Sequence, residues 1–463
     1  MLHLAADVPR LDLQARHATH HPAGRALILV GKAIEVVMVD EQTEAELGRT
    51  IRLLDVLVAG DDPPGEVGDL EAVDPLQHVV DRRAHQAKML RGLDLNLSAD
   101  QRALQREMHD WLKSNFESRF AEPTPEASRA WQRRLQEGGW GAPTWPVEHG
   151  GRGAGPIEAH LIAQELERAD APRPMTVIGI GWAGPAIIAH GSPDQKRQLL
   201  PRILDGSDLW CQLFSEPDAG SDLAGLRTRA EKKNGRWVVS GQKTWTSFAQ
   251  EADLGILLAR TDPSSARQAG ITCFAFKMRQ RGVEVRPIKQ MDGRATFNEV
   301  FFDGAEAAAE EVIGEVGDGW RVAITTLMSE RVGLSSGSGT LWGDGPSLGD
   351  LVELAGRTGL DARQRQRLAA LKVEWEAIRL TRYRMLSRPR SAHLSSIGKL
   401  MSDRWGQKVN ELAVELLGPA GLLLDTPWAQ SFLFSPALTI GGGTTEIQLD
   451  ILAQRVLGLP RAR

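Results

Sequence analysis

Residues 439–448 read TIGGGTTEIQ, three glycines followed by two threonines and a carboxylate at the start of an apolar helical pattern. Unshielded backbone N–H groups ahead of a helix can bind a phosphate group. Glycine-rich turns before helices are at least as often plain loops. The stretch alone leaves three alternatives open: a phosphate site, a chemical role for Glu446, and a simple joint.

Two further stretches have side chains that could bind a flat polar ligand. Residues 210–225 read WCQLFSEPDAGSDLAG, and their hydroxyl and N–H groups could hold a phosphate or a planar group; a turn-rich domain junction is the alternative. Residues 241–247 read GQKTWTS and follow a predicted strand. Strand alternation puts Trp245 and Ser247 on one face, where a ring could stack and accept one hydrogen bond. An ordinary half-buried strand would have the same pattern.

Glu330 is a candidate for acid–base chemistry on a predicted helix. The apolar stripe of this helix is formed by Trp320, Ala323, Ile324, Leu327 and Leu334. Glu330 falls on the flank of this stripe, and Arg331 follows it. Carboxylates are rarely buried without a partner. From the helical pattern alone, an ion pair between Glu330 and Arg331 is the simpler interpretation.

The elements that position these stretches divide the chain into four parts. Residues 1–92 include the acidic, turn-rich LVAGDDPPGEVGDLEAVDP and have no clear period, so we expect them not to belong to the catalytic fold, with Met89 as an alternative start. Residues 93–208 show helical patterns that begin at a capping box of Ser98 and Gln101. Residues 209–315 contain short strand-like runs and an Asn-Gly hairpin turn at 234–235. Residues 316–463 return to helical patterns, so the order predicts an α+β fold with a cleft where the domains meet.

Composition excludes several classes of protein. The 463 residues are 42% hydrophobic and 25% charged, as in ordinary soluble proteins. A net charge of −5 argues against a nucleic-acid partner. The two cysteines, Cys211 and Cys273, have neither metal-ligand nor disulfide spacing, which suits a reducing compartment. No membrane span or signal peptide is recognisable, so the sequence predicts a cytoplasmic protein without a bound metal.

Five segments in this order and spacing resemble the acyl-CoA dehydrogenases. They are WCQLFSEPDAGSDLAGLRTRAE, VVSGQKTWTSFAQEADLGILLARTD, GITCFAFKM, FNEVFF and IGGGTTEIQLDILAQRVLGLPR, and the resemblance runs from about residue 95 to residue 461. It implies an N-terminal helical domain, a central antiparallel β domain and a C-terminal four-helix bundle. It also implies FAD between the last two domains and a neighbouring subunit.

The resemblance assigns roles to particular residues. Ser215 would bond the pyrimidine edge of the flavin, Trp245 would pack on the isoalloxazine, and Ser247 would lie near N5. Ser221 would serve the pyrophosphate and the thioester arm of the substrate, and Arg331 would contact the acyl-CoA. The full set implied to bind the cofactor is Gln212, Phe214, Ser215, Gly220, Ser221, Trp245, Thr246, Ser247, Gly418, Gly443, Thr444 and Glu446.

The sequence also departs from the family pattern. Many members carry the catalytic Glu directly before the Gly-Thr of the last loop, where this chain has Gly442. A second family pattern has the base on the first helix of the C-terminal domain, and Glu330 matches it. The Arg-x-x-Phe-Gly stretch that reaches a neighbour's FAD is not visible, and Glu415 stands where the family has Gln. Both changes put the intersubunit FAD contacts in doubt.

The expected activity is FAD-dependent α,β-dehydrogenation of an acyl-CoA thioester to the 2-enoyl-CoA. Glu330 would remove the α-proton, and flavin N5 would accept the β-hydride. Electron-transfer flavoprotein is the expected acceptor, and the chain would form a homo-oligomer or a heterotetramer with a related chain. The alternatives are a flavin-binding, non-catalytic subunit of a heteromer and an acyl-CoA oxidase. The sequence does not specify the length, branching or ring character of the acyl group.

Overall fold

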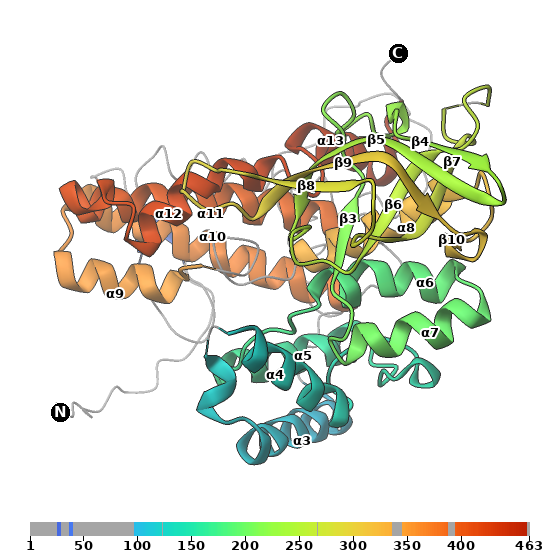
Figure 1. Ribbon diagram of the computed structural model, residues 1–463. Coiled ribbons are helices and arrows are strands. Elements are labelled where there is room, and N and C mark those ends of the chain that lie inside the picture. The colour runs from blue at the N-terminus through green and yellow to red at the C-terminus, as the bar shows by residue number, and fades with distance from the viewer. Residues whose placement is uncertain are drawn as a thin grey trace, which may run out of the picture.

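The computed structural model describes residues 97–122, 124–265, 267–335, 345–387 and 394–460, and two short strands near the N-terminus. These strands, β1 (Ala26–Ile28) and β2 (Val37–Val39), pair with each other. Most of residues 1–92 therefore lie outside the described residues, as does the expectation about their role. The rest of the chain forms a helical part, a sheet and a second helical part (Figure 1).

The first helical part begins where the sequence predicts. Ser98 caps α3 (Ala99–Asn115), accepting from the Gln101 N–H at 3.1 Å, while the Gln101 side chain accepts from the Ser98 N–H at 3.0 Å. This reciprocal pair is the expected capping box. The other helices are α4 (Pro125–Glu137), α5 (Pro156–Arg168), α6 (Gly184–His190) and α7 (Pro193–Leu204), with a π-helical turn, η4 (Gly179–Ala183), directly before α6.

The central sheet has eight strands and is mainly antiparallel. Its strands are β3 (Trp210–Leu213), β4 (Arg229–Lys233), β5 (Arg236–Ser247), β6 (Leu254–Arg260), β7 (Ile271–Lys277), β8 (Val283–Ile288), β9 (Phe297–Ala307) and β10 (Val312–Ile313). The order is β10-β7-β6-β4-β5-β9-β8, with β3 beside β6. Asn234 and Gly235 both have positive φ, as a tight β4–β5 turn requires. Two pairings are parallel, β3 with β6 and β4 with β6.

The second helical part is built on four long helices. They are α8 (Gly319–Ser335), α9 (Leu348–Thr358), α10 (Ala362–Ser387) and α11 (Ser395–Leu417), followed by α12 (Pro427–Phe434), η9 (Ser435–Thr439) and α13 (Thr445–Ile451). Helix α11 contacts α8, α9 and α10, so it is central to the bundle. The expected α+β architecture is confirmed. Within the described residues, no helix combines the length and apolarity that a membrane span needs.

One hydrophobic core joins all three parts. Ile187 of α6, Ile256 of β6 and Val322 of α8 are fully buried in the same cluster. Burial of apolar area is the main favourable contribution to folding. This shared core holds α8 between α6 and β7, with which it also makes contacts. The position of Glu330 relative to the sheet is therefore fixed by apolar packing at the start of its own helix.

Candidate active site

Glu330 lies on the buried face of α8. Its side chain is only 9% exposed, and the residues one and two turns earlier on this face, Thr326 and Val322, are fully buried. Of the expected apolar stripe, Ala323 is buried and Trp320 and Leu327 pack against the core, whereas Ile324 is 42% exposed. The prediction that Ile324 faces the core is wrong, and Glu330 is more enclosed than a flank position implies.

Glu330 is bonded to the sheet. The Gln212 side chain on β3 donates from Nε2 to Glu330 Oε2 at 3.1 Å. A hydrogen bond to an ionised carboxylate favours its charged form and restricts its orientation. Gln212 and Glu330, 118 residues apart in sequence, thus meet where the sheet and the C-terminal helices come together. The Arg331 side chain is outside the described residues, so the expected ion pair with Glu330 stays an expectation.

Trp245 stands on a β-bulge. The pairing of β5 with β9 shifts register between Lys243 and Thr246, and Trp245 in the shifted segment has φ 57°. Positive φ is a strained conformation for a bulky residue, and such strain concentrates at functional sites. The indole is 61% exposed, whereas Thr246 is buried and Ser247 is half-buried. The bulge therefore presents a large aromatic surface that the described part of the chain leaves open.

An aromatic series links this bulge to the C-terminal helices. Trp245 meets Phe297 of β9 edge-on, with ring centroids 6.1 Å apart. Phe297 in turn stacks on Phe434 of α12 at 6.3 Å. Aromatic pairs in such arrangements add stability beyond that of buried area alone. The Trp245 segment is thereby coupled to α12, which leads through η9 into the glycine-rich loop.

The loop after β3 is fastened to β5 by a buried ion pair. Lys243 is 0% exposed, and its Nζ donates to Glu216 Oε1 at 2.7 Å and to the Phe214 carbonyl at 2.9 Å. Burial lowers the pKa of Lys243 to about 8, although Glu216 opposes this shift. Burial also opposes the charge of Glu216, but Lys243 and the Arg227 N–H outweigh it and hold the Glu216 pKa below its usual value.

The glycine-rich loop is closed by Gln448. Its buried side chain donates from Nε2 to the Gly442 carbonyl at 2.9 Å and to the Gly443 carbonyl at 3.3 Å. Gly442 and Gly443 have φ of 67° and 96°, a region that favours glycine. A Cβ at Gly443 would also lie 2.5 Å from Gln448 Nε2. These two glycines are therefore required by geometry, and Thr444 caps α13 behind them.

The other predicted cofactor residues differ in how far they are exposed to solvent. Phe214 is buried and Ser215 half-buried, whereas Gly220, Ser221 and Glu446 are exposed. Gly418 ends α11 with φ 55°, on a segment separate from both loops. Glu415, in the family's Gln position, bonds Gln364 at 3.0 Å and forms an ion pair with Arg367. The Glu415 carboxylate is thus engaged by α10 of its own chain.

Three residues of the site were missed in the sequence: Glu216, Lys243 and Gln448. Lys243 is an even number of positions from the buried Trp237 and Val239 on β5. Alternation along the strand therefore already indicated that its side chain points toward the core. Glu216 lies inside the quoted loop, but nothing local to it indicates burial. Gln448 follows the glycines at the start of a helix. At this position the sequence pattern is the same whether the Gln side chain points toward the loop or toward solvent.

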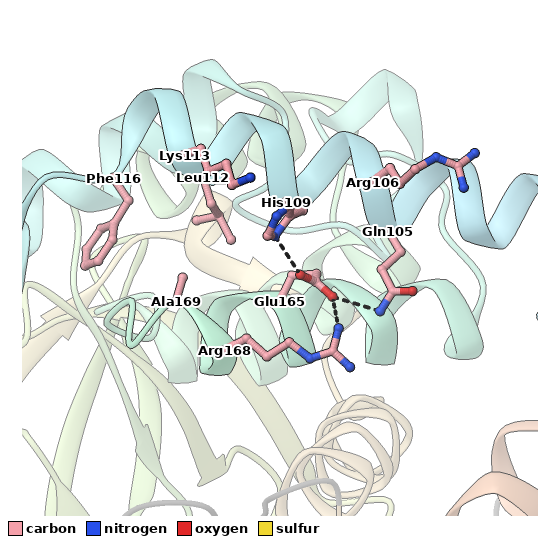
Figure 2. A pocket seen from close by; sticks show the side chains of 9 residues that line it. All are labelled: Gln105, Arg106, His109, Leu112, Lys113, Phe116, Glu165, Arg168 and Ala169. Carbon is pink, nitrogen blue, oxygen red and sulfur yellow. Dashed lines mark hydrogen bonds and ion pairs between the residues drawn. The ribbon is translucent and has the colours of Figure 1, made fainter. Parts of the chain in front are cut away.

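A groove elsewhere on the surface contains none of the predicted site residues. It has a volume of about 530 Å³ and is lined by α3, α5 and the residues that end them (Figure 2). Glu165 on its floor is 2% exposed, accepts from Gln105 Nε2 at 2.8 Å, and pairs with Arg168 and His109. The cluster braces α3 against α5. It provides a buried carboxylate for comparison with those near the loops.

The order of a helical part, a central sheet and a second helical part, with Glu330 of α8 bonded to Gln212 of β3, corresponds to the order of the acyl-CoA dehydrogenase domains. Models of the N-terminal, middle and C-terminal domains of acyl-CoA dehydrogenase match residues 98–207, 211–305 and 317–457. The chain belongs to the acyl-CoA dehydrogenase family, and the resemblance in sequence is confirmed.

Individual relatives support the same assignment. "Acyl-CoA dehydrogenase IpdE1" of Mycobacterium tuberculosis is 40% identical over 377 residues, which cover 77% of this chain and 97% of that protein. Two solved structures each cover 80% of this chain and 100% of their own with a TM-score of 0.68: "Tcur3481-Tcur3483 steroid ACAD" at 26% identity, and the "ChsE4-ChsE5 complex" from Mycobacterium tuberculosis at 29%. The chain is an acyl-CoA dehydrogenase-type oxidoreductase.

Proposed function

We propose that this protein catalyses the FAD-dependent α,β-dehydrogenation of an acyl-CoA thioester, with Glu330 as the catalytic base. The observation that carries the proposal is the position of Glu330, which is buried on α8 and bonded to Gln212 of β3. A base must be held at hydrogen-bonding reach of the proton it removes. The resemblance implies that FAD lies between the β domain and the C-terminal bundle, so a carboxylate held there would be within such reach of a substrate beside the flavin.

Two positions in the glycine-rich loop, Gly442 and Glu446, fit the role of base less well than Glu330 does. Gly442, at the position where many family members have Glu, has no side chain that could move a proton. Glu446 is exposed, and its place in the loop matches a residue that the family uses for cofactor contact. Water around an exposed carboxylate weakens every electrostatic interaction with the substrate. Glu330 is the carboxylate whose surroundings suit proton abstraction.

The residues of the two loops fit FAD. Gln212 Oε1, Thr246 Oγ1 and Gln448 Oε1 are buried without a hydrogen-bond partner in the described part of the chain. Unpaired buried polar atoms are costly, and these three lie on or beside segments that the resemblance assigns to the cofactor, where a polar ligand could bond them. Ser215, Trp245, Ser247 and the loop of Gly443, Thr444 and Glu446 would hold the cofactor. Bound FAD would supply the acceptor for the hydride that leaves the β-carbon.

The remaining steps belong to the protein. Arg331 and Ser221 would bind the acyl-CoA so that its α-carbon faces Glu330. The α-proton passes to the Glu330 carboxylate as the carbon–carbon double bond forms. The Gln212 amide keeps Oε2 in place during the transfer, because it holds that oxygen at 3.1 Å. General-base catalysis of this kind contributes about 10²–10⁴-fold in rate.

The substrate proposed here is a CoA thioester attached to a ring system. The support is the solved neighbour named a steroid acyl-CoA dehydrogenase, which covers 80% of the chain at 26% identity. The proposed acceptor of the electrons is an electron-transfer flavoprotein. Production of hydrogen peroxide during aerobic turnover would instead identify an oxidase.

A second candidate is a flavin-binding subunit that completes a partner's site. Gly442 and Glu415, which depart from the family pattern, favour it. The two candidates differ in what Glu330 does. As a base it must determine the rate of flavin reduction, and in a non-catalytic subunit its replacement should leave that rate unchanged.

The deciding experiment mixes the FAD-loaded protein with steroid-type and straight-chain acyl-CoAs without oxygen. We expect the visible absorbance of the flavin to bleach and the acyl-CoA to lose two hydrogens as it becomes the 2-enoyl-CoA. Glu330→Gln should bind FAD and acyl-CoA normally but reduce the flavin about 10²-fold more slowly. Glu315→Gln, an exposed carboxylate just before α8, is the control and should react normally. Equal rates in the two variants would contradict the assignment of Glu330.

A further inference from the structure

Three consecutive residues of the loop after β3 are bonded to two consecutive residues of β5. The Phe214 carbonyl accepts from Lys243 Nζ at 2.9 Å, the Ser215 carbonyl accepts from the Thr244 N–H at 2.9 Å, and Glu216 Oε1 accepts from Lys243 Nζ at 2.7 Å. Lys243 and Thr244 directly precede Trp245. The loop and the bulge, both assigned to FAD, are therefore joined at their base.

Glu216 also fixes the far end of the same loop. Its carboxylate accepts from the Arg227 N–H at 2.6 Å and from the Thr228 N–H at 3.0 Å. The loop thus begins at Glu216 and ends where the Arg227 and Thr228 N–H groups bond the Glu216 carboxylate. Backbone N–H groups bonded to an ionised acceptor make short, strong hydrogen bonds. A single buried side chain consequently determines where the loop that carries Ser221 begins and ends.

A buried ion pair connects two segments at a cost in the free energy of folding. Removing two charges from water costs free energy that their mutual attraction need not recover, and apolar pairs of similar volume are often as stable. What a charged pair adds is a defined geometry, because both partners must keep their hydrogen bonds. Lys243 and Glu216 meet this description: Lys243 is fully buried, and Glu216 is 7% exposed.

We propose that Lys243 and Glu216 are positioning residues that hold the Phe214–Ser215 segment and the Trp245 bulge in the arrangement that binds FAD. The inference rests on the proposed function, because it assumes that these segments contact the cofactor. Lys243 and Glu216 act through their neighbours: their own polar groups are occupied by each other and by backbone atoms. Loss of either charge breaks the side-chain connection between the loop and the bulge, leaves the backbone hydrogen bond between Ser215 and Thr244, and should weaken cofactor binding more than it weakens the fold.

The test compares FAD binding with stability in four full-length variants. They are Glu216→Gln, Lys243→Met, the double variant of both, and Glu165→Gln as a control. Glu165 is a carboxylate of comparable burial in the α3–α5 brace. Each protein is stripped of flavin and titrated with FAD, and its melting temperature is measured without FAD. The visible circular dichroism of bound FAD reports the surroundings of the ring.

We expect both single variants to bind FAD about tenfold more weakly or worse, with an altered visible dichroism, because a site must be held closely to its binding geometry. Glu165→Gln should lower the melting temperature but leave FAD affinity within about twofold. The double variant removes the unpaired charge, so it should recover stability without recovering affinity. If a single variant fails to fold, the FAD affinity of the double variant tests the proposal.

Three outcomes would overturn the inference. Unchanged FAD affinity in both single variants, or in the double variant, means that the pair does not position the cofactor loops. An equal loss in Glu165→Gln means that the effect is general instability. If the unaltered protein, correctly folded and assembled, binds no FAD, the proposed cofactor fails and the inference fails with it. The first two results leave the proposed function intact, so the two failures are distinguishable.

Discussion

Gln212 on β3 donates a hydrogen bond of 3.1 Å to Glu330 on α8, and the other atom of its amide, Oε1, is buried without a described partner. One side chain of the sheet therefore orients the carboxylate of the helix while keeping an acceptor free. A hydrogen bond to a buried carboxylate restricts the direction in which the carboxylate points. The pair places the proposed base and the first residue of the proposed flavin segment in direct contact.

The first prediction concerns this contact. Gln212→Leu removes the donor while keeping an extended side chain, so Glu330 loses a hydrogen bond to its charged form. Such bonds contribute about 1.5–3 kcal/mol, and we expect the rate of flavin reduction at saturating acyl-CoA to fall by about tenfold or more. Stopped-flow absorbance without oxygen measures it. Gln105→Leu, which removes the Gln105–Glu165 bond in the α3–α5 brace, is the control and should keep the normal rate.

The second prediction concerns the glycine-rich loop. Gly443→Ala places a side chain at φ 96° and a Cβ 2.5 Å from Gln448 Nε2, so this amide must move away from the loop carbonyls to which it donates. We expect this variant to lose FAD during gel filtration. Gly304→Ala, at φ 69° in β9 with no atom within 4 Å of the new Cβ, tests backbone strain alone. It should cost about 1–2 kcal/mol in stability and retain its flavin, and loss of flavin from both variants would count against a specific role for Gly443.

The third prediction is a pH dependence. The pKa of Lys243 is lowered to about 8 from 10.5, so between these values the folded protein binds fewer protons at this site than the unfolded chain does. The contribution of Lys243 to the free energy of unfolding therefore increases as pH rises through this window and is complete above 10.5. Lys243→Met should lack this increase. Urea unfolding from pH 7 to pH 10 measures both slopes; parallel slopes would mean that Lys243 has an ordinary pKa.

Local patterns in the sequence predicted the elements but not how they meet. The capping box at Ser98 and the Asn234–Gly235 turn depend on neighbours within a few residues, and both are confirmed. The α+β order followed from periodicity alone, and the resemblance to a known family added the four-helix bundle. The two parallel pairings of β6 were not predicted, because pairing direction depends on contacts far apart in sequence.

The position of Glu330 shows most clearly what local sequence patterns fail to predict. Counting apolar residues placed Glu330 on the flank of the stripe on α8, because a count of apolar residues does not include Thr326 or Glu330. In the structure these two polar residues lie along the middle of the buried face, and Ile324 is exposed. A polar residue can occupy such a face when another segment supplies its hydrogen bonds. Gln212 does so for Glu330, and no local pattern joins residues 118 apart.

The fourth prediction concerns the N-terminal segment. The family models begin to match at residue 98, after the change of pattern near residue 92. We therefore expect a protein that starts at Met89 to fold, bind FAD and reduce it with acyl-CoA at the normal rate. Its flavin content and melting temperature are compared with those of the full chain. Insolubility or loss of flavin on truncation would show that residues 1–88 belong to the catalytic fold.

The last prediction concerns assembly. The resemblance implies a Gln of an FAD loop at the position of Glu415, and Glu415 is held by Arg367 and Gln364 of its own chain. Such an acid, already engaged, should repel rather than bind the phosphates of a second subunit's cofactor. A solved neighbour is likewise a complex of two different proteins. We therefore expect this chain to be oligomeric and to acquire its full flavin content with a related chain rather than with copies of itself.

Co-expression with a related chain and light scattering test this assembly. The 50.6 kDa chain purified alone should carry less than one FAD per chain, and the co-expressed pair should form a stable heterotetramer with higher flavin content and activity. Glu415→Gln restores the family's residue and should raise the flavin content of the chain purified alone, whereas Glu411→Gln, an exposed acid one turn earlier on α11, should not. A homo-oligomer with one FAD per chain would contradict the heteromer, and an active monomer would contradict both forms of assembly, because a monomer offers no neighbouring subunit to complete the FAD site.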